Sequence, residues 1–152
     1  MWTNLGLTII LAIAWFTIGI ESLLLVQVPI TLISAGVGVW LFYIQHQFED
    51  TYWRNTPEWS FHKAGIEGSS YYDLPVVLHW FTGNIGFHHI HHLASRIPNY
   101  RLRECFRKVP ELHQVTRLTI MTSLRCARLH LWDEAEKRLV SFRYLRTLRA
   151  NA

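Results

Sequence analysis

The first third of this sequence lacks positive charge. None of the 15 Lys and Arg residues lies before Arg54, and the acidic residues ahead of it are Glu21, Glu49 and Asp50. The formal charge of +4 and the pI of about 9.3 therefore describe the later residues, and this uneven distribution argues against a nucleic-acid-binding protein. A basic part that follows an apolar part is typical of a membrane protein whose basic part faces the cytoplasm.

Cysteine is scarce, and several common motifs are missing. Cys105 and Cys126 have no metal-type spacing, which makes a disulfide framework improbable and favours reduced thiols in the cytoplasm. No basic segment or small-residue cleavage site follows Met1, so a signal peptide is a poor interpretation. The sequence also contains no His-Glu-x-x-His zinc motif, no Gly-rich phosphate loop and no Gly-x-Ser-x-Gly nucleophile turn.

Long hydrophobic runs, in contrast, are present. Half of the residues (50%) are hydrophobic and only 17% are charged, and two runs without charge extend from Leu5 to Ile20 and from Ser22 to Ile44. A helix needs about 20 apolar residues to cross a bilayer. We therefore predict a membrane hairpin with spans at about 5–20 and 22–44 and a turn between Glu21 and Pro29. The alternative is a buried helical hairpin of a soluble protein.

The remaining residues predict further helices outside the membrane. Leu74 to Phe87 is apolar and aromatic but too short to span, which favours an interfacial or re-entrant segment. Glu111 to Arg149 favours helix, as part of a basic cytoplasmic tail over residues 103–152. The predicted fold class is all-α: an integral membrane hairpin, a cytoplasmic helix that carries histidines, and a basic helical tail.

A cluster of four histidines follows Phe87. On a helix, His88, His91 and His92 share a face because they are three or four residues apart, whereas His89 points away. Three neutral imidazoles at this spacing predict a metal site, and imidazole suits iron, zinc, copper and nickel alike. The alternative is a set of solvent-exposed histidines without a ligand role.

His46 is a second candidate, at the end of the second apolar run. An ionisable group at the end of a membrane helix is a functional candidate by default, and the alternative is an interfacial histidine that caps the helix. Glu49, three residues further on, could bind metal or orient His46.

The residues His88, His91 and His92, followed by Leu93-Ala-Ser-Arg-Ile-Pro-Asn-Tyr-Arg-Leu102, resemble the third histidine box of the membrane fatty acid desaturases, most closely the bacterial and cyanobacterial acyl-lipid type. The segment from Phe42 to Trp53 resembles the segment after the last membrane helix in that family. The resemblance extends from about Leu5 to Leu102, within a desaturase domain placed at residues 1–102.

That resemblance implies roles for individual residues. His46, His88, His91 and His92 would be ligands of a di-iron centre, and no catalytic side chain is implied beyond them. Asn84, just before the box, would hold an iron-bound water. His79 matches no histidine box, and we expect it to support a ligand or to be structural. Glu49, taken alone, is expected to be a surface carboxylate. The remaining histidines, His62, His113 and His130, are expected at the surface.

One departure from the family matters. Complete desaturases have two earlier histidine boxes, and no histidine precedes His46 here. The chain therefore resembles the carboxy-terminal half only, with an incomplete iron centre, and we expect it to be inactive alone. The implied function is a fragment of an oxygen-dependent desaturase that introduces a cis double bond into an acyl chain. The alternatives are a non-catalytic remnant or split half that needs a partner, and a related lipid or carotenoid hydroxylase or ketolase.

The resemblance also implies partners and a location. The substrate would be an acyl lipid or acyl-CoA, and the electron donor a ferredoxin or a cytochrome b5-like protein. The expected location is the bacterial inner membrane, with the carboxy terminus in the cytoplasm. No nucleic-acid partner is expected.

Overall fold

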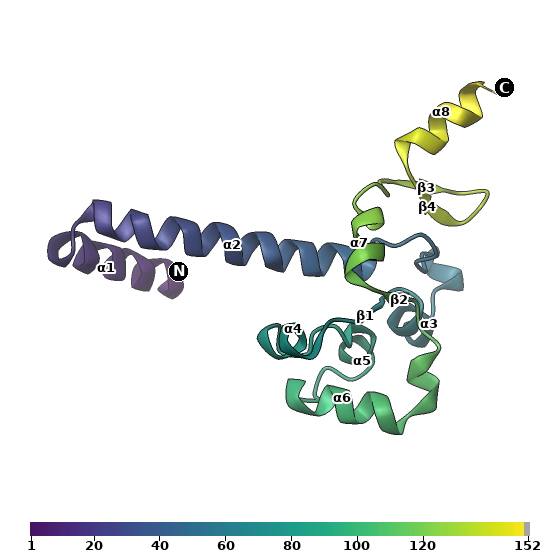
Figure 1. The fold of residues 1–152 in the computed structure, drawn as a ribbon, viewed down its shortest axis with the longest axis horizontal. Coiled ribbons are helices and arrows are strands. Elements are labelled where there is room, and N and C mark those ends of the chain that lie inside the picture. The colour runs from purple at the N-terminus through teal and green to yellow at the C-terminus, as the bar shows by residue number, and fades with distance from the viewer. Residues whose placement is uncertain (151–152) are drawn as a thin grey trace. The chain divides into compact units, whose positions relative to one another are not determined.

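Helices dominate the structure, a computed structural model that describes residues 1–150 (Figure 1). The α-helices are α1 (Trp2–Thr17), α2 (Ile20–His46), α3 (Phe61–Ile66), α4 (Val76–Phe81), α5 (His88–Leu93), α6 (Asn99–Lys108), α7 (Ile120–Cys126) and α8 (Phe142–Ala150). Two short 3-10 helices are Thr56–Glu58 and Pro110–His113. The strands are β1 (Tyr71–Tyr72), β2 (Arg117–Leu118), β3 (Leu131–Asp133) and β4 (Arg138–Val140). The chain divides into two compact units, Met1–Leu41 and Phe42–Ala152.

The first unit is a helical hairpin with a very tight turn. Gly19 has a φ of +79°, a left-handed conformation that glycine adopts without steric cost, and it lies between α1 and α2. The predicted turn between Glu21 and Pro29 is therefore wrong. Glu21 lies in the first turn of α2, where a carboxylate is favoured by the helix dipole, and Pro29 lies inside the helix.

The second helix, α2, is long and apolar enough to cross a membrane, with 27 residues and a length of about 40 Å. At 16 residues, α1 is apolar but shorter. No residue of α1 is buried, and in α2 only Ile44 and Gln45 at its end are.

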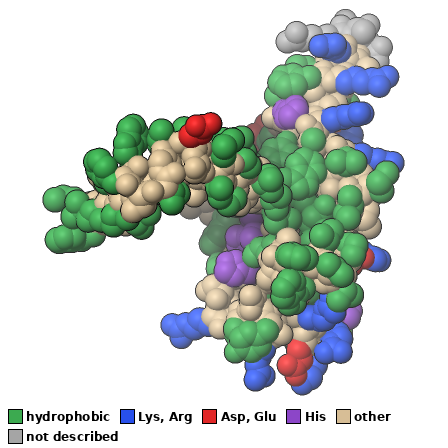
Figure 2. Space-filling view, turned by 60° about the vertical axis from the view of Figure 1, so that its left-hand side comes forward, with side chains coloured by type: hydrophobic (Ala, Val, Ile, Leu, Met, Phe, Trp, Pro, Cys, Tyr) green, Lys and Arg blue, Asp and Glu red, His purple; other side chains and the backbone are tan. Residues whose placement is uncertain are grey.

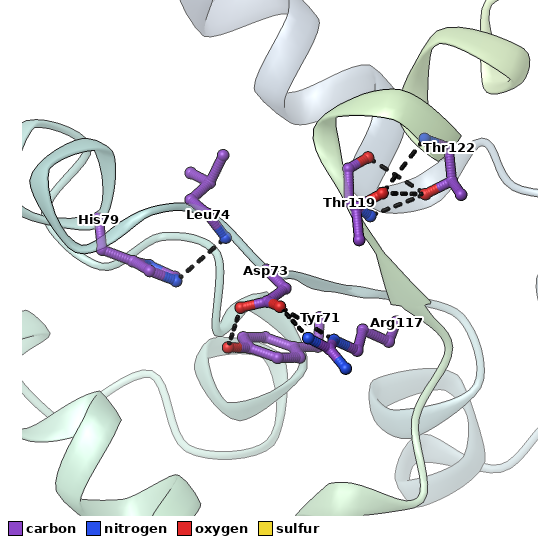
Figure 3. Close-up of polar contacts among 7 residues, drawn as sticks. All are labelled: Tyr71, Asp73, Leu74, His79, Arg117, Thr119 and Thr122. Carbon is purple, nitrogen blue, oxygen red and sulfur yellow. Dashed lines mark hydrogen bonds and ion pairs between the residues drawn. The ribbon is translucent and has the colours of Figure 1, made fainter.

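The second unit has a hydrophobic core under α5 and α6. Phe87, Ile90, Leu102 and Leu112 form this core and are at most 7% exposed. The second unit also contains a short parallel strand pair, β1 with β2, in which Tyr72 lies beside Leu118. Next to the pair, Asp73 accepts hydrogen bonds from the Tyr71 hydroxyl (2.9 Å) and from the Arg117 guanidinium (Figure 3).

The region predicted as a helical tail is only partly helical. Its helix α7 is capped by the preceding Thr119, whose side chain accepts a hydrogen bond from the backbone N–H of Thr122 (Figure 3). After it come the antiparallel strands β3 and β4, in which Trp132 pairs with Leu139, and then α8. The all-α prediction is thus confirmed for most of the chain, but it missed four short strands among residues 1–150.

The apolar segment predicted at Leu74 to Phe87 forms α4 and the loop after it. Leu74 and Phe87 at its two ends are buried, whereas four of its large side chains, Val76, Val77, Trp80 and Phe81, are 63–74% exposed. An interfacial position for them stays a prediction.

Candidate metal centre

The histidine helix α5 is held by its apolar side. Phe87 and Ile90 lie in the core, and Gly86 packs so closely that an added Cβ would lie 2.3 Å from the Tyr72 carbonyl oxygen. Because residues three and four apart share a face, burying Ile90 leaves His88 and His92 together on another side of α5. The helix predicted from the histidine spacing is confirmed by this geometry.

Hydrogen bonds between Gln45 and two backbone groups hold the end of α2 beside α5. Gln45 is buried, and its side-chain Nε2 donates to the carbonyl oxygen of Ile85 at 2.8 Å. The Gln45 carbonyl in turn accepts from the backbone N–H of Ser70 at 3.0 Å. These bonds fix the next residue, His46, beside α5.

Three imidazole nitrogens converge at this place. The Nε2 atoms of His46, His88 and His92 are 3.0 Å (His46 to His92), 3.2 Å (His46 to His88) and 3.1 Å (His88 to His92) apart. A hydrogen bond needs one donor and one acceptor, so three neutral imidazoles cannot satisfy all three contacts at once. A bound cation would resolve this crowding of lone pairs.

The ring orientation of His46 is set by its own helix. Its Nδ1–H donates to the carbonyl oxygen of Phe42 at 2.8 Å. In a neutral imidazole the Nε2 atom then carries the lone pair, and this atom faces the other two histidines. The backbone of α2 therefore selects the tautomer that a metal needs.

Protonation is disfavoured at two of the three rings. Burial, together with the neighbouring His46 and His92, lowers the pKa of His88 to about 3. Burial also lowers the pKa of His92, and His46 and His91 act in the same direction. Both imidazoles are thus neutral at pH 7, the state in which histidine binds metal.

The donor set fits a transition metal. Bonds of about 2.0–2.1 Å to one ion bring neighbouring ligand nitrogens to about 3.0–3.4 Å from one another. The observed separations of 3.0–3.2 Å are of this size. Imidazole nitrogens suit iron, zinc, copper and nickel alike, so the donor set would hold a transition metal without selecting one.

His91 lies outside this triangle. Its side chain is exposed, and its ring centroid is 5.8 Å from that of His88 and 6.2 Å from that of His92. The three nitrogens that lie close together are those of His46, His88 and His92. A ligand role for His91 stays a prediction.

The other predicted site residues have different neighbours. Glu49 is exposed and pairs with Arg138 at 2.7 Å. Asn84 has a φ of +59°, and its side-chain N–H donates to the Asn99 carbonyl oxygen at 3.2 Å. These contacts involve no ring of the cluster.

His79 is buried and has a structural environment. Its Nε2 accepts from the backbone N–H of Leu74 at 3.3 Å (Figure 3), and its ring stacks on Phe87 with centroids 4.9 Å apart. Burial lowers its pKa, and so does Arg103. His79 thus packs against Phe87, the residue that precedes the cluster, and does not face the cluster itself. His62, His113 and His130 are exposed, as predicted.

Sequence reasoning missed how deeply His89 is buried. This side chain is 0% exposed, and burial lowers its pKa to about 4. Its ring lies beside the backbone of Ser70 and Leu112 without a hydrogen bond of good geometry within residues 1–150. The spacing showed only that His89 points away from the cluster, because the depth of burial depends on residues far along the chain.

An open cavity of about 490 Å³ borders the cluster at His46. Its walls include three aromatic side chains, Tyr52, Trp53 and Trp132, and the two tryptophan rings are 5.7 Å apart between centroids. Space for a partly apolar group thus exists beside one ring of the triangle.

A match to known proteins decides the family. The family model described as fatty acid desaturase matches residues 1–122. The chain belongs to the fatty acid desaturase family. A curated fatty acid desaturase of Bacillus subtilis (strain 168) is 47% identical to this desaturase chain over 144 residues, which cover 95% of the chain and 41% of that protein. The chain thus spans about two fifths of the length of this curated relative. A search of the solved structures found no significant match.

Proposed function

We propose that this chain is the carboxy-terminal part of a membrane-embedded, di-iron fatty acid desaturase. The observation that carries the proposal is the triangle of Nε2 atoms from His46, His88 and His92 in a chain of this family. It combines a ligand from the end of an apolar helix with two from a His-x-x-His-His motif.

Each histidine of the chain has a distinct role in this proposal. His46, His88 and His92 would hold one iron, and the exposed His91 would face the second, with ligands from the rest of the protein. When bound, the iron supplies oxygen-dependent oxidation that removes two hydrogens from an acyl chain and leaves a cis double bond. The Phe42 carbonyl keeps His46 in the right tautomer, and burial keeps His88 neutral.

The apolar hairpin supports a membrane location for this reaction. An acyl lipid or acyl-CoA has its hydrocarbon tail in or near the bilayer, where α2 would lie. In this proposal the basic second unit is cytoplasmic in a bacterial inner membrane, within reach of an electron donor such as ferredoxin or cytochrome b5.

A second candidate, a split half or inert remnant, is favoured by two observations. The chain covers 41% of its curated relative, and the described residues bring three imidazole nitrogens together, fewer than two irons need. In either case the family and the ligand roles stay the same, and the difference lies in whether a partner supplies the other ligands.

A chimera tests the function. The segment of the Bacillus subtilis relative that aligns with this chain is replaced by residues 1–152, and the protein is expressed in a host without a desaturase. We expect monounsaturated fatty acids by gas chromatography and mass spectrometry, and none from the chain expressed alone. A chimera that inserts and retains iron but yields only saturated chains would overturn the desaturase proposal, and hydroxylated products would indicate a hydroxylase.

Matched variants of the chimera test whether the unsaturated product depends on the histidine cluster. His88→Ala and His91→Ala should each abolish unsaturated product, because each removes a proposed iron ligand. His62→Ala removes an exposed histidine outside the cluster and should leave product levels unchanged. Full activity of His91→Ala would remove that residue from the ligand set while leaving the triangle intact.

A further inference from the structure

Basic side chains surround a second hollow, far along the chain from the histidine motif. This hollow has a volume of about 550 Å³ and lies between the loop after α7 and the first two turns of α8. None of its lining residues is acidic, and they are Arg128, His130, Ser141, Phe142, Arg143 and Arg146. We call this hollow the arginine pocket.

In the part of the chain that the structure describes, no carboxylate pairs with the arginines of the arginine pocket. Its three arginines are exposed. Within residues 1–150, ion pairs with carboxylates are formed by Arg101, Lys108, Arg117 and Arg138, and by none of the three. Figure 2 shows Lys and Arg side chains, in blue, in the upper part of the molecule, where Figure 1 places α8. Uncompensated guanidinium groups around a hollow create a field that attracts anions.

Local structure arranges these groups toward one binding place. Arg143 and Arg146 are three residues apart on α8 and so share a face of that helix. The start of α8 borders the same hollow and adds the partial positive charge of a helix amino terminus. Phe142 lies over His130, with ring centroids 5.6 Å apart, and supplies an apolar wall.

We propose that the arginine pocket binds the phosphate group of an anionic ligand. Guanidinium groups match phosphate oxygens in pairs, and three of them neutralise more than one negative charge. The volume is within the range of small-molecule sites and exceeds what one phosphate ion fills, so the phosphate would carry a further group. An anionic phospholipid headgroup and a soluble organic phosphate share this chemistry. The proposal does not depend on the metal centre.

Calorimetric titration of the full chain in an uncharged detergent at low ionic strength tests the pocket. The probes are short-chain phosphatidylglycerol, short-chain phosphatidylcholine (the same phosphate without net charge) and inorganic phosphate. We expect the triple variant with Arg128→Gln, Arg143→Gln and Arg146→Gln to bind phosphatidylglycerol or phosphate about tenfold more weakly. A control triple variant, with Arg96→Gln, Arg101→Gln and Arg107→Gln, removes the same charge elsewhere and should bind as the unchanged chain does.

Each outcome decides the proposal. Loss confined to the pocket variant supports it, with phosphatidylglycerol alone indicating a lipid headgroup and competition by inorganic phosphate indicating a soluble ligand. An equal loss in both triple variants would mean diffuse charge attraction and would overturn it, as would unchanged binding in the pocket variant. If circular dichroism shows that the triple variant is unfolded, Arg143→Gln and Arg143→Lys are compared instead, and equal affinities of these two would overturn the proposal.

Discussion

The two units of this chain place their apolar side chains in opposite ways. The helical hairpin buries none of α1 and little of α2, although it is the most hydrophobic part of the sequence. The second unit, which contains all of the Lys and Arg, buries Phe48, Ile44 and Ile90 almost completely. Exposed apolar side chains in such number are typical of a segment that is covered by lipid or by another part of a protein. The comparison teaches that the exposed apolar surface and the three converging histidines belong to different units of the chain.

The largest expected effect is a loss of metal affinity without a change in membrane association. His92→Ala removes one corner of the nitrogen triangle, and we expect affinity for iron(II) or cobalt(II) to fall at least about a hundredfold. Membrane association should not change, because the first unit is intact. Metal titration of the purified chain, together with membrane fractionation, measures both. Unchanged metal affinity would remove His92 from the site, and His62→Ala serves as the matched control.

The next effect concerns membrane insertion alone. Ile33 lies near the middle of α2 and is 67% exposed. Arginine there should oppose membrane insertion by about 3 kcal/mol, which carbonate extraction of membranes detects as a soluble or aggregated fraction. Phe61→Arg adds the same charge at a 59% exposed position of the second unit and should leave extraction unchanged. Equal extraction of the two variants would contradict the expectation that only the first unit inserts into the membrane.

A smaller effect compares one glycine from each unit. Gly86→Ala places a Cβ 2.3 Å from the Tyr72 carbonyl oxygen, a backbone atom that cannot move aside. We expect a loss of about 1–3 kcal/mol of unfolding free energy. Gly36→Ala meets nothing within 4 Å and lies inside α2, so it should be neutral or stabilise the helix by about 0.5–1 kcal/mol. Denaturation followed by tryptophan fluorescence checks both, and a harmless Gly86→Ala would show that α5 packs more loosely than described.

The smallest effect concerns pH. Burial raises the pKa of Asp73, but hydrogen bonds from Arg117 and Tyr71 outweigh it and hold the pKa below its usual value. A carboxyl with a lowered folded-state pKa stabilises the fold above its unfolded value of about 3.9, and this stability is lost as pH falls through the folded pKa. Because Arg117 is 66% exposed, we expect less than about 1 kcal/mol. Asp73→Asn should remove this part of the acid-induced loss, and an unchanged acid profile would contradict it.

Local spacing was enough to predict that His88 and His92 share a face, because the i, i+4 relation needs only a helix. It made His46 a candidate through its place after an apolar run, but it left a capping role open, and it grouped His91 with the cluster, whereas the structure brings His46 there. Distant contacts were needed for the rest. The Gln45 to Ile85 hydrogen bond joins residues that are 40 apart in the chain, and no sequence pattern predicts it.

Two errors have clear physical causes. Glu21 and Pro29 suggested a turn by residue type, but Gly19 adopts positive φ more easily than either, and α2 tolerates Pro29 within it. The strands β3 and β4 were missed because charged residues of the connecting turn, such as Glu134 and Lys137, also favour helix. The pairing of the two strands, in which Leu131, Trp132 and Asp133 lie opposite Val140, Leu139 and Arg138, makes an extended conformation stable there.

The nitrogen triangle has a topological consequence. A metal held by His46 and His88 would link residues 42 apart in the chain, and so would act as a removable crosslink. Unlike a disulfide, this link would not persist in the unfolded chain, where no site is preformed, so the free energy of metal binding would add to the stability of the fold. Loading the site would then raise the unfolding temperature of the second unit, and a chelator would remove that increase.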